Sequence, residues 1–187
     1  VRMTLDRPNR KLLDEKLVDV CTNISNNNQN NILELIKSGA DINGEEVYYG
    51  APLIKACLTS NWNTAYYLLE MGADVNVKDA RDFPPLMAAY GLPTVELLVS
   101  KGADIHAQEN LQGWTKLHRA CSGGIKDVVE FLIRKGADIH QRGKRRGAIP
   151  LWIASRYGYK EIVELLLKKG AEINLTEVSQ YDHLLEQ

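Results

Sequence analysis

A short phrase recurs along this chain at nearly constant spacing, and it limits the fold more than any other feature. Four copies read Gly-Ala-Asp-(Ile/Val)-(Asn/His), and a fifth reads Gly-Ala-Glu-Ile-Asn. They begin at Gly39, Gly72, Gly102, Gly136 and Gly170, so the intervals are 33, 30, 34 and 34 residues. A fixed period between about 20 and 50 residues predicts a stack of similar supersecondary units.

Each unit contains two short apolar patterns, which predict a helix, a turn and a second helix. Four apolar residues of the fourth unit lie at i, i+1, i+4 and i+5, namely Val128, Val129, Leu132 and Ile133. Residues 162–167 of the fifth unit repeat this spacing. The spacing places the apolar side chains on one face of a helix. We therefore expect the second helix of each unit to bury one side.

The residues at the ends of the predicted helices fit known capping preferences. The glycine that opens each phrase fits the position just after the second helix, where the chain enters the left-handed region. Pro52, Pro85 and Pro150 open first helices, where a missing N–H costs nothing. Thr115 is expected to cap the first helix of the fourth unit. The corresponding residues of the other units have no capping side chain and are Ala51, Pro84 and Ile149.

The start of the fourth unit carries a recognisable motif. Residues 115–120 read Thr-Lys-Leu-His-Arg-Ala, which resembles the ankyrin signature Thr-Pro-Leu-His-x-Ala. The resemblance continues at residues 51–56, 84–88 and 149–154, and covers roughly residues 11–174. It implies an all-α ankyrin-repeat solenoid of about five helix-turn-helix units with short β-hairpin fingers. His118, in the signature, is expected to tie its helix to a finger by hydrogen bonding.

The repeat phrases divide the chain into units of one domain, residues 1–187. The first unit lacks the signature but keeps Leu13, Leu17, Val20 and Ile24 on one face, as an end unit with one polar side requires. The predicted organisation is an N-terminal capping repeat at 1–43, repeat 2 at 44–76, a short repeat 3 at 77–106, repeat 4 at 107–140, repeat 5 at 141–174 and a C-terminal tail or cap at 175–187.

The third unit is shorter than its neighbours. Residues 85–90 predict a stunted first helix, and Gly91-Leu92-Pro93 leads at once into the second helix. In repeat arrays, stability is approximately a sum of terms for units and for interfaces between neighbours. A unit with less apolar surface weakens both of its interfaces, so we expect the array to open here first.

Composition excludes several other classes of protein. The chain has 187 residues, 44% of them hydrophobic and 25% charged, with a net charge of −1. This is an ordinary globular composition without the strongly basic balance of many nucleic-acid-binding domains. The sequence has no apolar run long enough for a membrane span and no signal-peptide pattern at its start. We expect a monomer in the cytoplasm or nucleus, or, if the source is a pathogen, in the host cell.

Residues with catalytic or metal-binding chemistry do not form known motifs. The three cysteines are an odd number, and Cys57 and Cys121 occupy the same position in units two repeats apart, so we expect buried thiols. His106 and His140 occupy equivalent positions in adjacent units, about 10 Å apart on the helix-packing scale. Two ligands of one zinc ion must each lie about 2 Å from it. We therefore predict no enzyme activity, no cofactor and no metal.

The resemblance implies that partner proteins contact the fingers and the exposed side of the first helices. Tyr, Trp and Arg side chains carry much of the energy in protein interfaces. Two of the aromatic residues, Phe83 and Trp114, could instead pack between neighbouring fingers. The candidate partner-binding residues are Tyr48, Tyr49, Leu58, Thr59, Arg81, Phe83, Gln112, Trp114, Arg119, Ser122, Arg142, Lys144, Arg145, Arg156 and Tyr157.

Residues 142–146, Arg-Gly-Lys-Arg-Arg, form the densest charge cluster. The cluster is either a solvated loop or a binding site. As a binding site it would pair with an acidic or phosphorylated protein segment, or with the phosphates of RNA. Because no stacking aromatic residues are interleaved with it, the cluster favours a protein partner over nucleic acid. A nuclear-import sequence is a further alternative.

Two functional hypotheses and one modification follow. The first is a non-catalytic scaffold that binds another protein through its finger and inner-helix groove. The second is phosphate or RNA binding through Arg142, Lys144, Arg145 and Arg146, which a steep loss of affinity with salt would reveal. In addition, Asn43, Asn76 and Asn174 resemble the loop asparagines that asparaginyl hydroxylases modify in some ankyrin proteins.

Overall fold

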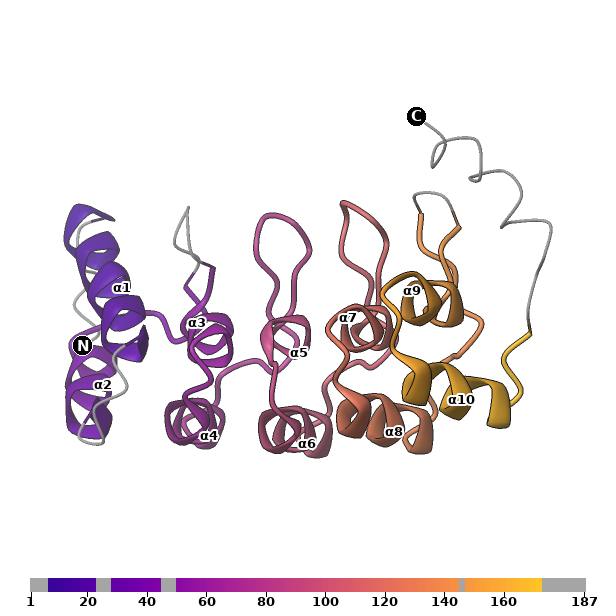
Figure 1. Cartoon of the computed structure of the whole chain (residues 1–187). Coiled ribbons are helices and arrows are strands. Elements are labelled where there is room, and N and C mark those ends of the chain that lie inside the picture. Colours follow the sequence, from indigo (N-terminus) through magenta and orange to yellow (C-terminus); the bar gives the residue numbers. More distant parts are fainter. Residues whose placement is uncertain (1–6, 23–27, 45–49, 145–146, 173–187) are drawn as a thin grey trace.

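A computed structural model of the chain describes residues 7–22, 28–44, 50–144 and 147–172. The helices of this part lie in two layers, and one pair follows another along the stack (Figure 1). The first layer holds α1 (Arg7–Thr22), α3 (Pro52–Leu58), α5 (Pro85–Ala88), α7 (Lys116–Ser122) and α9 (Pro150–Arg156). The second holds α2 (Asn28–Lys37), α4 (Trp62–Glu70), α6 (Leu92–Ser100), α8 (Lys126–Arg134) and α10 (Lys160–Lys168).

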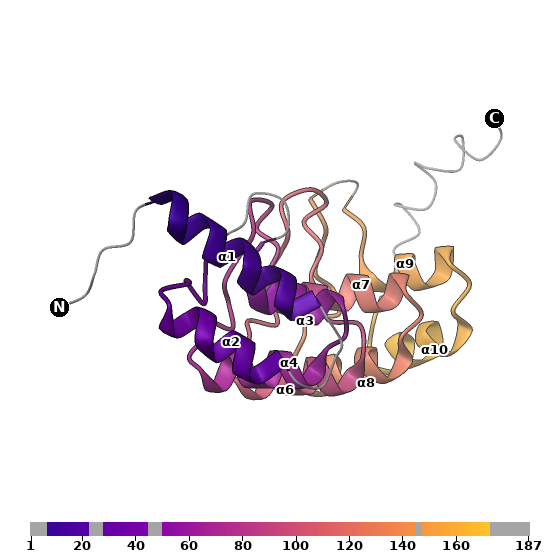
Figure 2. The same ribbon diagram turned by 90° about the vertical axis from the view of Figure 1, so that its left-hand side faces the viewer.

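This arrangement confirms the predicted all-α stack of helix-turn-helix units. The predicted β-hairpin fingers are not confirmed, because no helix pair is joined by a β-strand in the described ranges. The connections are instead loops that stand above the first layer (Figures 1 and 2). In the loop between α4 and α5, for example, the N–H of Asp79 donates to the carbonyl of Phe83 at 3.3 Å. We call these loops the fingers and number each by the unit whose first helix follows it, so that the third finger joins α4 to α5, the fourth joins α6 to α7 and the fifth joins α8 to α9.

The hydrophobic core runs between the two layers along the whole stack. Equivalent leucines of the first helices point into it, and equivalent leucines of the second helices meet them. Each such side chain contributes about 1.5–3 kcal/mol when it is fully buried. These residues are at most 5% exposed and are Leu53, Leu86, Leu117 and Leu151 in the first layer and Leu68, Leu98, Leu132 and Leu166 in the second.

The second helices end as their glycines predict. Gly102, which follows α6, has a φ of 89°, in the left-handed region. Its N–H donates to the carbonyl of Val99 at 3.1 Å, and the next N–H, that of Ala103, donates to the carbonyl of Leu98 at 2.9 Å. This pair of bonds satisfies the last carbonyl groups of the helix. The same conformation closes α2, α4, α8 and α10, so the five phrases mark the same structural position.

The first helices begin as predicted, with one addition. Three of them have proline in the first turn, and the residues before these prolines make no side-chain cap. Thr115 precedes α7, and its N–H donates to Nδ1 of His118 at 3.1 Å. The histidine side chain thus satisfies the backbone at the helix start, because it lies one turn into the helix.

Asparagine side chains connect successive units, and aspartate side chains form hydrogen bonds within each unit. Asn43 accepts a hydrogen bond from the N–H of Asp74 at 2.8 Å, and Asn76 accepts one from the N–H of Asp104 at 2.9 Å. Within each unit the aspartate accepts from the residue two positions later; the N–H of Asn76 donates to Asp74 at 2.9 Å. Side chains that bond to backbone across a unit boundary fix the register of the stack.

The two ends of the described stack differ in how far the predictions apply. Leu17 of α1 is fully buried, and Leu13 and Val20 are partly buried against the core, as the predicted apolar face requires. Ile24 lies outside the described residues. The third unit has a first helix of only 4 residues, as predicted. The limits of the individual units and the tail or cap at 175–187 remain predictions.

Candidate binding surface

We call the described parts of the fingers, together with the exposed sides of the first helices, the inner surface. Two of the fingers are organised from inside by an acidic residue, Asp79 in the third finger and Glu109 in the fourth. Glu109 is 5% exposed and accepts from the N–H groups of Leu111, Gln112 and Trp114 at 2.7, 2.8 and 3.1 Å. Burial acts to raise the pKa of Glu109, but these donors together with Arg119 hold that pKa below its ordinary value. The finger is therefore a fixed loop.

Neighbouring fingers also touch one another. The N–H of Asn110 donates to the carbonyl of Arg81 at 3.1 Å, which joins the third and fourth fingers. A Cβ placed on Gly113 would lie 2.6 Å from the backbone nitrogen of Lys144, and a Cβ on Gly143 would lie 3.0 Å from Trp114. At Gly113, whose φ is 67°, any side chain would collide with this backbone atom, and at Gly143 the neighbouring ring would have to shift. The fourth and fifth fingers therefore form a packed wall.

Two arginines of the first layer lie against aromatic rings on the inner surface. The guanidinium of Arg119 lies 5.1 Å from the ring centre of Phe83, and that of Arg156 lies 5.3 Å from the ring centre of Trp152. A cation over an aromatic face gains about 0.5–1 kcal/mol at exposed sites. Both cations are thus held in place while their other sides face outward.

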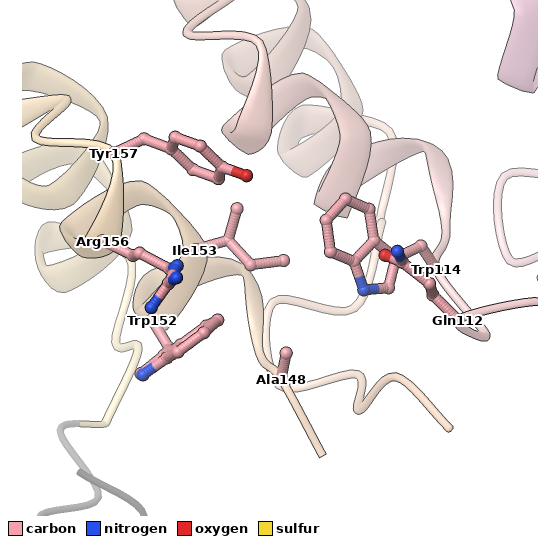
Figure 3. A pocket seen from close by; sticks show the side chains of 7 residues that line it. All are labelled: Gln112, Trp114, Ala148, Trp152, Ile153, Arg156 and Tyr157. Atoms are coloured by element: carbon pink, nitrogen blue, oxygen red, sulfur yellow. The ribbon is translucent and has the colours of Figure 1, made fainter. Parts of the chain in front are cut away.

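A cavity of about 300 Å³ lies between the fourth finger and α9. Figure 3 shows Trp114 on one side and Ile153 and Tyr157 on the other, with Arg156 beside Trp152 at the edge. The lining residues are Gln112, Trp114, Ala148, Trp152, Ile153, Arg156 and Tyr157. Most of this lining is aromatic or aliphatic, and one positive charge stands at its border.

The predicted partner-binding residues are distributed unevenly. Gln112, Trp114, Arg156 and Tyr157 come together around the cavity. The predicted residues that are largely exposed are Leu58, Arg81, Gln112, Arg142, Lys144, Arg156 and Tyr157. Those that are half-buried are Thr59, Phe83, Trp114, Arg119 and Ser122. Tyr48, Tyr49 and Arg145, together with Arg146 of the basic cluster, lie outside the described residues.

Phe83 and Trp114 combine both roles that the sequence leaves open. Phe83 packs against the core, yet its ring also carries the guanidinium groups of Arg81 and Arg119. Trp114 stacks on His118 with 6.2 Å between ring centres and 15° between planes, and it also lines the cavity. Packing therefore holds both rings in place, and each ring still contributes to the inner surface.

The histidines occupy very different environments. His118 is fully buried, and its Nε2 donates to the carbonyl of Ala148 at 3.1 Å, which ties α7 to the next finger as expected. Burial lowers the pKa of His118. His106 and His140 are exposed, and their backbone N–H groups donate to Asp104 and Asp138. Within the described ranges, no cluster of three or more His, Cys, Asp or Glu residues is placed to hold a metal ion.

The remaining chemical groups have structural environments. Cys21, Cys57 and Cys121 are buried free thiols, and burial raises the pKa of each to about 12. The amide of Asn76 is exposed and bonded to the next unit, and Asn43 is half-buried. Hydroxylation of either residue remains a prediction, and Asn174 lies outside the described residues. No helix in the described part is of the length and apolarity that a membrane crossing requires.

Two residues at or beneath this surface were not predicted from the sequence. Trp152 takes the position in α9 that His118 takes in α7, so the signal was an aromatic residue in place of the signature histidine. Lys116 takes the position of the prolines, yet it is only 3% exposed. Its ammonium donates to the carbonyl of Ala89 and lies 5.9 Å from the ring centre of Tyr90.

Comparison with known proteins agrees with this architecture. The sequence model of a family described as ankyrin repeats, in 3 copies, matches residues 86–177. The chain is 35% identical over 97 residues to transient receptor potential cation channel subfamily A member 1 of Homo sapiens. That match includes 48% of the chain but 9% of the channel, so the chain spans only a small part of the length of this relative.

Proposed function

We propose a function from one premise: the chain belongs to the ankyrin repeat family. Ankyrin repeats are generally protein–protein interaction modules. This chain acts, in our proposal, as a non-catalytic scaffold that binds another protein through the inner surface. It works as a monomer in the cytoplasm or nucleus, and it needs no cofactor.

One observation supports this proposal most strongly: aromatic and arginine side chains of the inner surface are already held in place by packing. Tyr157, 53% exposed, stands at the end of α9, and Arg119 and Arg156 lie on aromatic rings. Side chains of these types contribute most to binding energy in protein interfaces. Because packing already orders them, a partner loses less free energy in fixing them on binding.

The charge of this surface favours an acidic or phosphorylated segment of the partner. Arg81, Arg119, Arg142, Lys144 and Arg156 lie on it, and guanidinium groups pair with carboxylate or phosphate through two parallel hydrogen bonds. Arg81 already pairs with Asp79 at 2.7 Å, so we assign the partner's anionic groups to the fourth and fifth units.

Site-specific photo-crosslinking in the native cell tests the proposal. A photoreactive amino acid replaces Leu58 or Ser122 on the inner surface, or Tyr66 or Glu130 on the second layer as matched controls. Leu58, Tyr66 and Glu130 are exposed, and Ser122 is half-buried. We expect a common crosslinked protein from the two inner positions and not from the controls. Crosslinks only from Tyr66 and Glu130 would show that the opposite layer binds.

A salt titration separates this function from its alternative, binding of RNA or phosphate through residues 142–146. Release of counterions from a nucleic acid makes affinity fall steeply with salt. For the crosslinked partner we expect the affinity to depend only weakly on salt, and we expect Tyr157→Ala to abolish its binding. Binding of RNA would be favoured by two results together. The affinity would fall steeply with salt and less steeply when Arg142 and Lys144 become Gln, and Tyr157→Ala would leave the affinity unchanged.

The modification has its own test. Coexpression with an asparaginyl hydroxylase is expected to add oxygen at Asn43, Asn76 or Asn174, as measured by intact mass and peptide sequencing. The variant with all three changed to Ala is the control. An unchanged mass of the wild-type chain would remove this part of the proposal.

A further inference from the structure

The cavity beside α9 has the size and lining of a site for one side chain. Its volume of about 300 Å³ corresponds to roughly ten water molecules at their share of liquid volume. Trp114, Trp152 and Tyr157 provide its accessible apolar lining, and Ile153, which also borders the cavity, is fully buried (Figure 3). Burial of an aromatic side chain removes about 150–250 Å² of surface from water. A bulky apolar side chain would bury part of this surface against the aromatic walls of the cavity.

The walls of the cavity are ordered before any ligand enters. Trp114 stacks on the buried His118, and Gly143 of the next finger approaches its edge. Tyr157 stacks on Tyr159 with 6.4 Å between ring centres and 25° between planes. Ile153 is fully buried within α9. A site whose walls already hold their positions loses little conformational entropy on binding.

The charge at the border restricts which side chain can enter. Arg156 lies over Trp152, and no carboxylate is among the lining residues. Within the described ranges, Arg156 forms no salt bridge with Asp or Glu. An ammonium group of a ligand would meet a like charge at this point, whereas a carboxylate would meet a guanidinium that pairs with no Asp or Glu of the described residues.

We propose that this cavity holds one bulky apolar side chain of an acidic segment of the partner protein, and that Arg156 binds a carboxylate next to it in that segment. The inference rests on the proposed function, since it names the partner chemistry of the same surface. It adds an anchor position and a rule of selection: an aromatic or large aliphatic residue is accepted beside Glu or Asp and rejected beside Lys.

Nuclear magnetic resonance of the indole N–H groups tests this proposal directly. The chain has three tryptophans, of which Trp114 and Trp152 line the cavity while Trp62 lies on α4 in the second layer. The probe is a synthetic peptide with a central Phe between Glu residues in a Gly-Ser background. We expect the signals of Trp114 and Trp152 to shift and that of Trp62 to stay in place, because Trp62 is an internal control.

Matched peptides test the rule of selection. Replacement of the central Phe by Ala, or of the flanking Glu by Lys, is expected to weaken binding by at least about tenfold, as loss of an interface hot spot does. Absence of any shift at about 1 mM of the Phe-Glu peptide would contradict the proposal. Equal binding of the Lys-flanked peptide would contradict the role of Arg156.

Two matched arginine variants separate charge recognition from packing. Arg156→Gln is expected to weaken the Glu-flanked peptide about tenfold and to leave a Gln-flanked peptide almost unchanged. Arg134 lies over Phe131 at 5.6 Å on α8, in the second layer, so Arg134→Gln removes a similarly placed cation outside the cavity. Equal effects of both variants on the Glu-flanked peptide would overturn the assignment of Arg156.

Two other occupants give distinct results, and either would overturn the proposal. A second copy of the chain would make the signals of Trp114 and Trp152 depend on protein concentration, together with a larger sedimentation coefficient. The chain's own residues Tyr181-Asp182 have the same chemistry. If the substitution Tyr181→Ala shifts the signals of Trp114 and Trp152 when no peptide is present, the chain's own segment at Tyr181-Asp182 occupies the cavity.

The results that would contradict the proposal for the cavity differ from those that would contradict the proposed function. If Tyr157→Ala and Arg156→Gln keep the crosslinked partner while Arg119→Gln loses it, the inner surface binds a protein but the cavity is not the anchor. If the partner crosslinks only through Tyr66 and Glu130, the proposed function itself is wrong. The peptide measurement then still reports whether the cavity accepts an acidic segment.

Discussion

His118 connects two units through the two nitrogen atoms of its ring. Nδ1 accepts from the N–H of Thr115 at 3.1 Å and lies 2.8 Å from the hydroxyl of the same residue. Nε2 donates to the carbonyl of Ala148 at the base of the fifth finger. These bonds define the neutral form with hydrogen on Nε2. The residue therefore orders both the start of α7 and one side of the cavity.

We predict that His118→Ala lowers the free energy of unfolding by about 3 kcal/mol. Loss of the cap contributes about 1 kcal/mol, and the carbonyl of Ala148, left without its donor, adds about 1–3 kcal/mol. His106→Ala is the control at an exposed position and should change stability by less than about 0.5 kcal/mol. Urea unfolding measures both. Similar effects of the two substitutions would contradict the role given to His118.

Lys116 places a titratable group inside the core. Burial lowers the pKa of Lys116 from 10.5 to about 7, and Arg119 acts in the same direction. The thiol of Cys57 is nearby and neutral, since its pKa is about 12. In the unfolded chain the lysine keeps its ordinary pKa, so between about pH 7 and 10.5 the unfolded state binds more protons than the folded state.

The stability of the chain should therefore rise with pH above about 7. Neutral Lys116 stabilises the folded chain relative to the charged form. This contribution is complete above the unfolded pKa of 10.5 and is lost as the pH falls through the folded pKa of about 7. Lys116→Met should flatten the profile. Lys135 lies on the surface over Phe131 at 5.7 Å, so Lys135→Met is the control that keeps the slope. Denaturant midpoints across this pH range give the answer; an unchanged slope in Lys116→Met would contradict the assignment.

At the scale of the element, α5 is the exceptional part of the stack. It has 4 residues, while α3, α7 and α9 have 7 each. The ammonium of Lys116 reaches from the start of α7 to the carbonyl of Ala89, just after α5. A polar side chain thus contacts the end of the short helix.

We predict that α5 and α6 are the first internal helices to open. Their unit has the least helical surface to bury against its neighbours, and local opening requires the least free energy where buried apolar contacts are fewest. Hydrogen exchange followed by mass spectrometry compares them with α3–α4 and α7–α8. Faster exchange in α5–α6 is the expected result, and the best protection in α5–α6 would refute the prediction.

The elements could be predicted from the sequence because each is governed by local chemistry. Pro85 and Thr115 mark helix starts, and Gly102 marks a helix end, through the backbone conformations that they allow. The tie made by His118 followed from the family signature. Pairing within the fingers was predicted as regular β-structure, but it reduces to single hydrogen bonds such as that from Glu109 to Trp114 at 3.1 Å.

The cavity could be predicted only in part, because it depends on contacts between units. The sequence placed Trp114 and Tyr157 on the same surface but did not indicate that Trp152 joins them. The position of Lys116 was also missed, since a lysine in place of proline reads as an exposed residue. Lys116 is buried where its side chain reaches the carbonyl of Ala89, which lies 27 residues earlier in the chain and directly after the short helix α5.

At the scale of the whole molecule, hydrogen bonds between units fix the stack, and the stack determines which surface remains exposed. The second layer packs against the first, and the amide ladder through Asn43 and Asn76 fixes successive units. The fingers stand clear of both layers (Figure 2). The fourth and fifth fingers, with α7 and α9, then present ordered aromatic and cationic side chains together. A rigid extended surface of this kind suits recognition of another protein.

Hydrogen exchange of the chain alone and with its crosslinked partner tests this central claim most directly. We predict slower exchange in the fingers and in α7 and α9 when the partner is bound, with α4 and α6 unchanged. Binding through the inner surface requires this pattern, because only those backbone segments would be covered. Slower exchange confined to the second layer, with the fingers unchanged, would contradict the account.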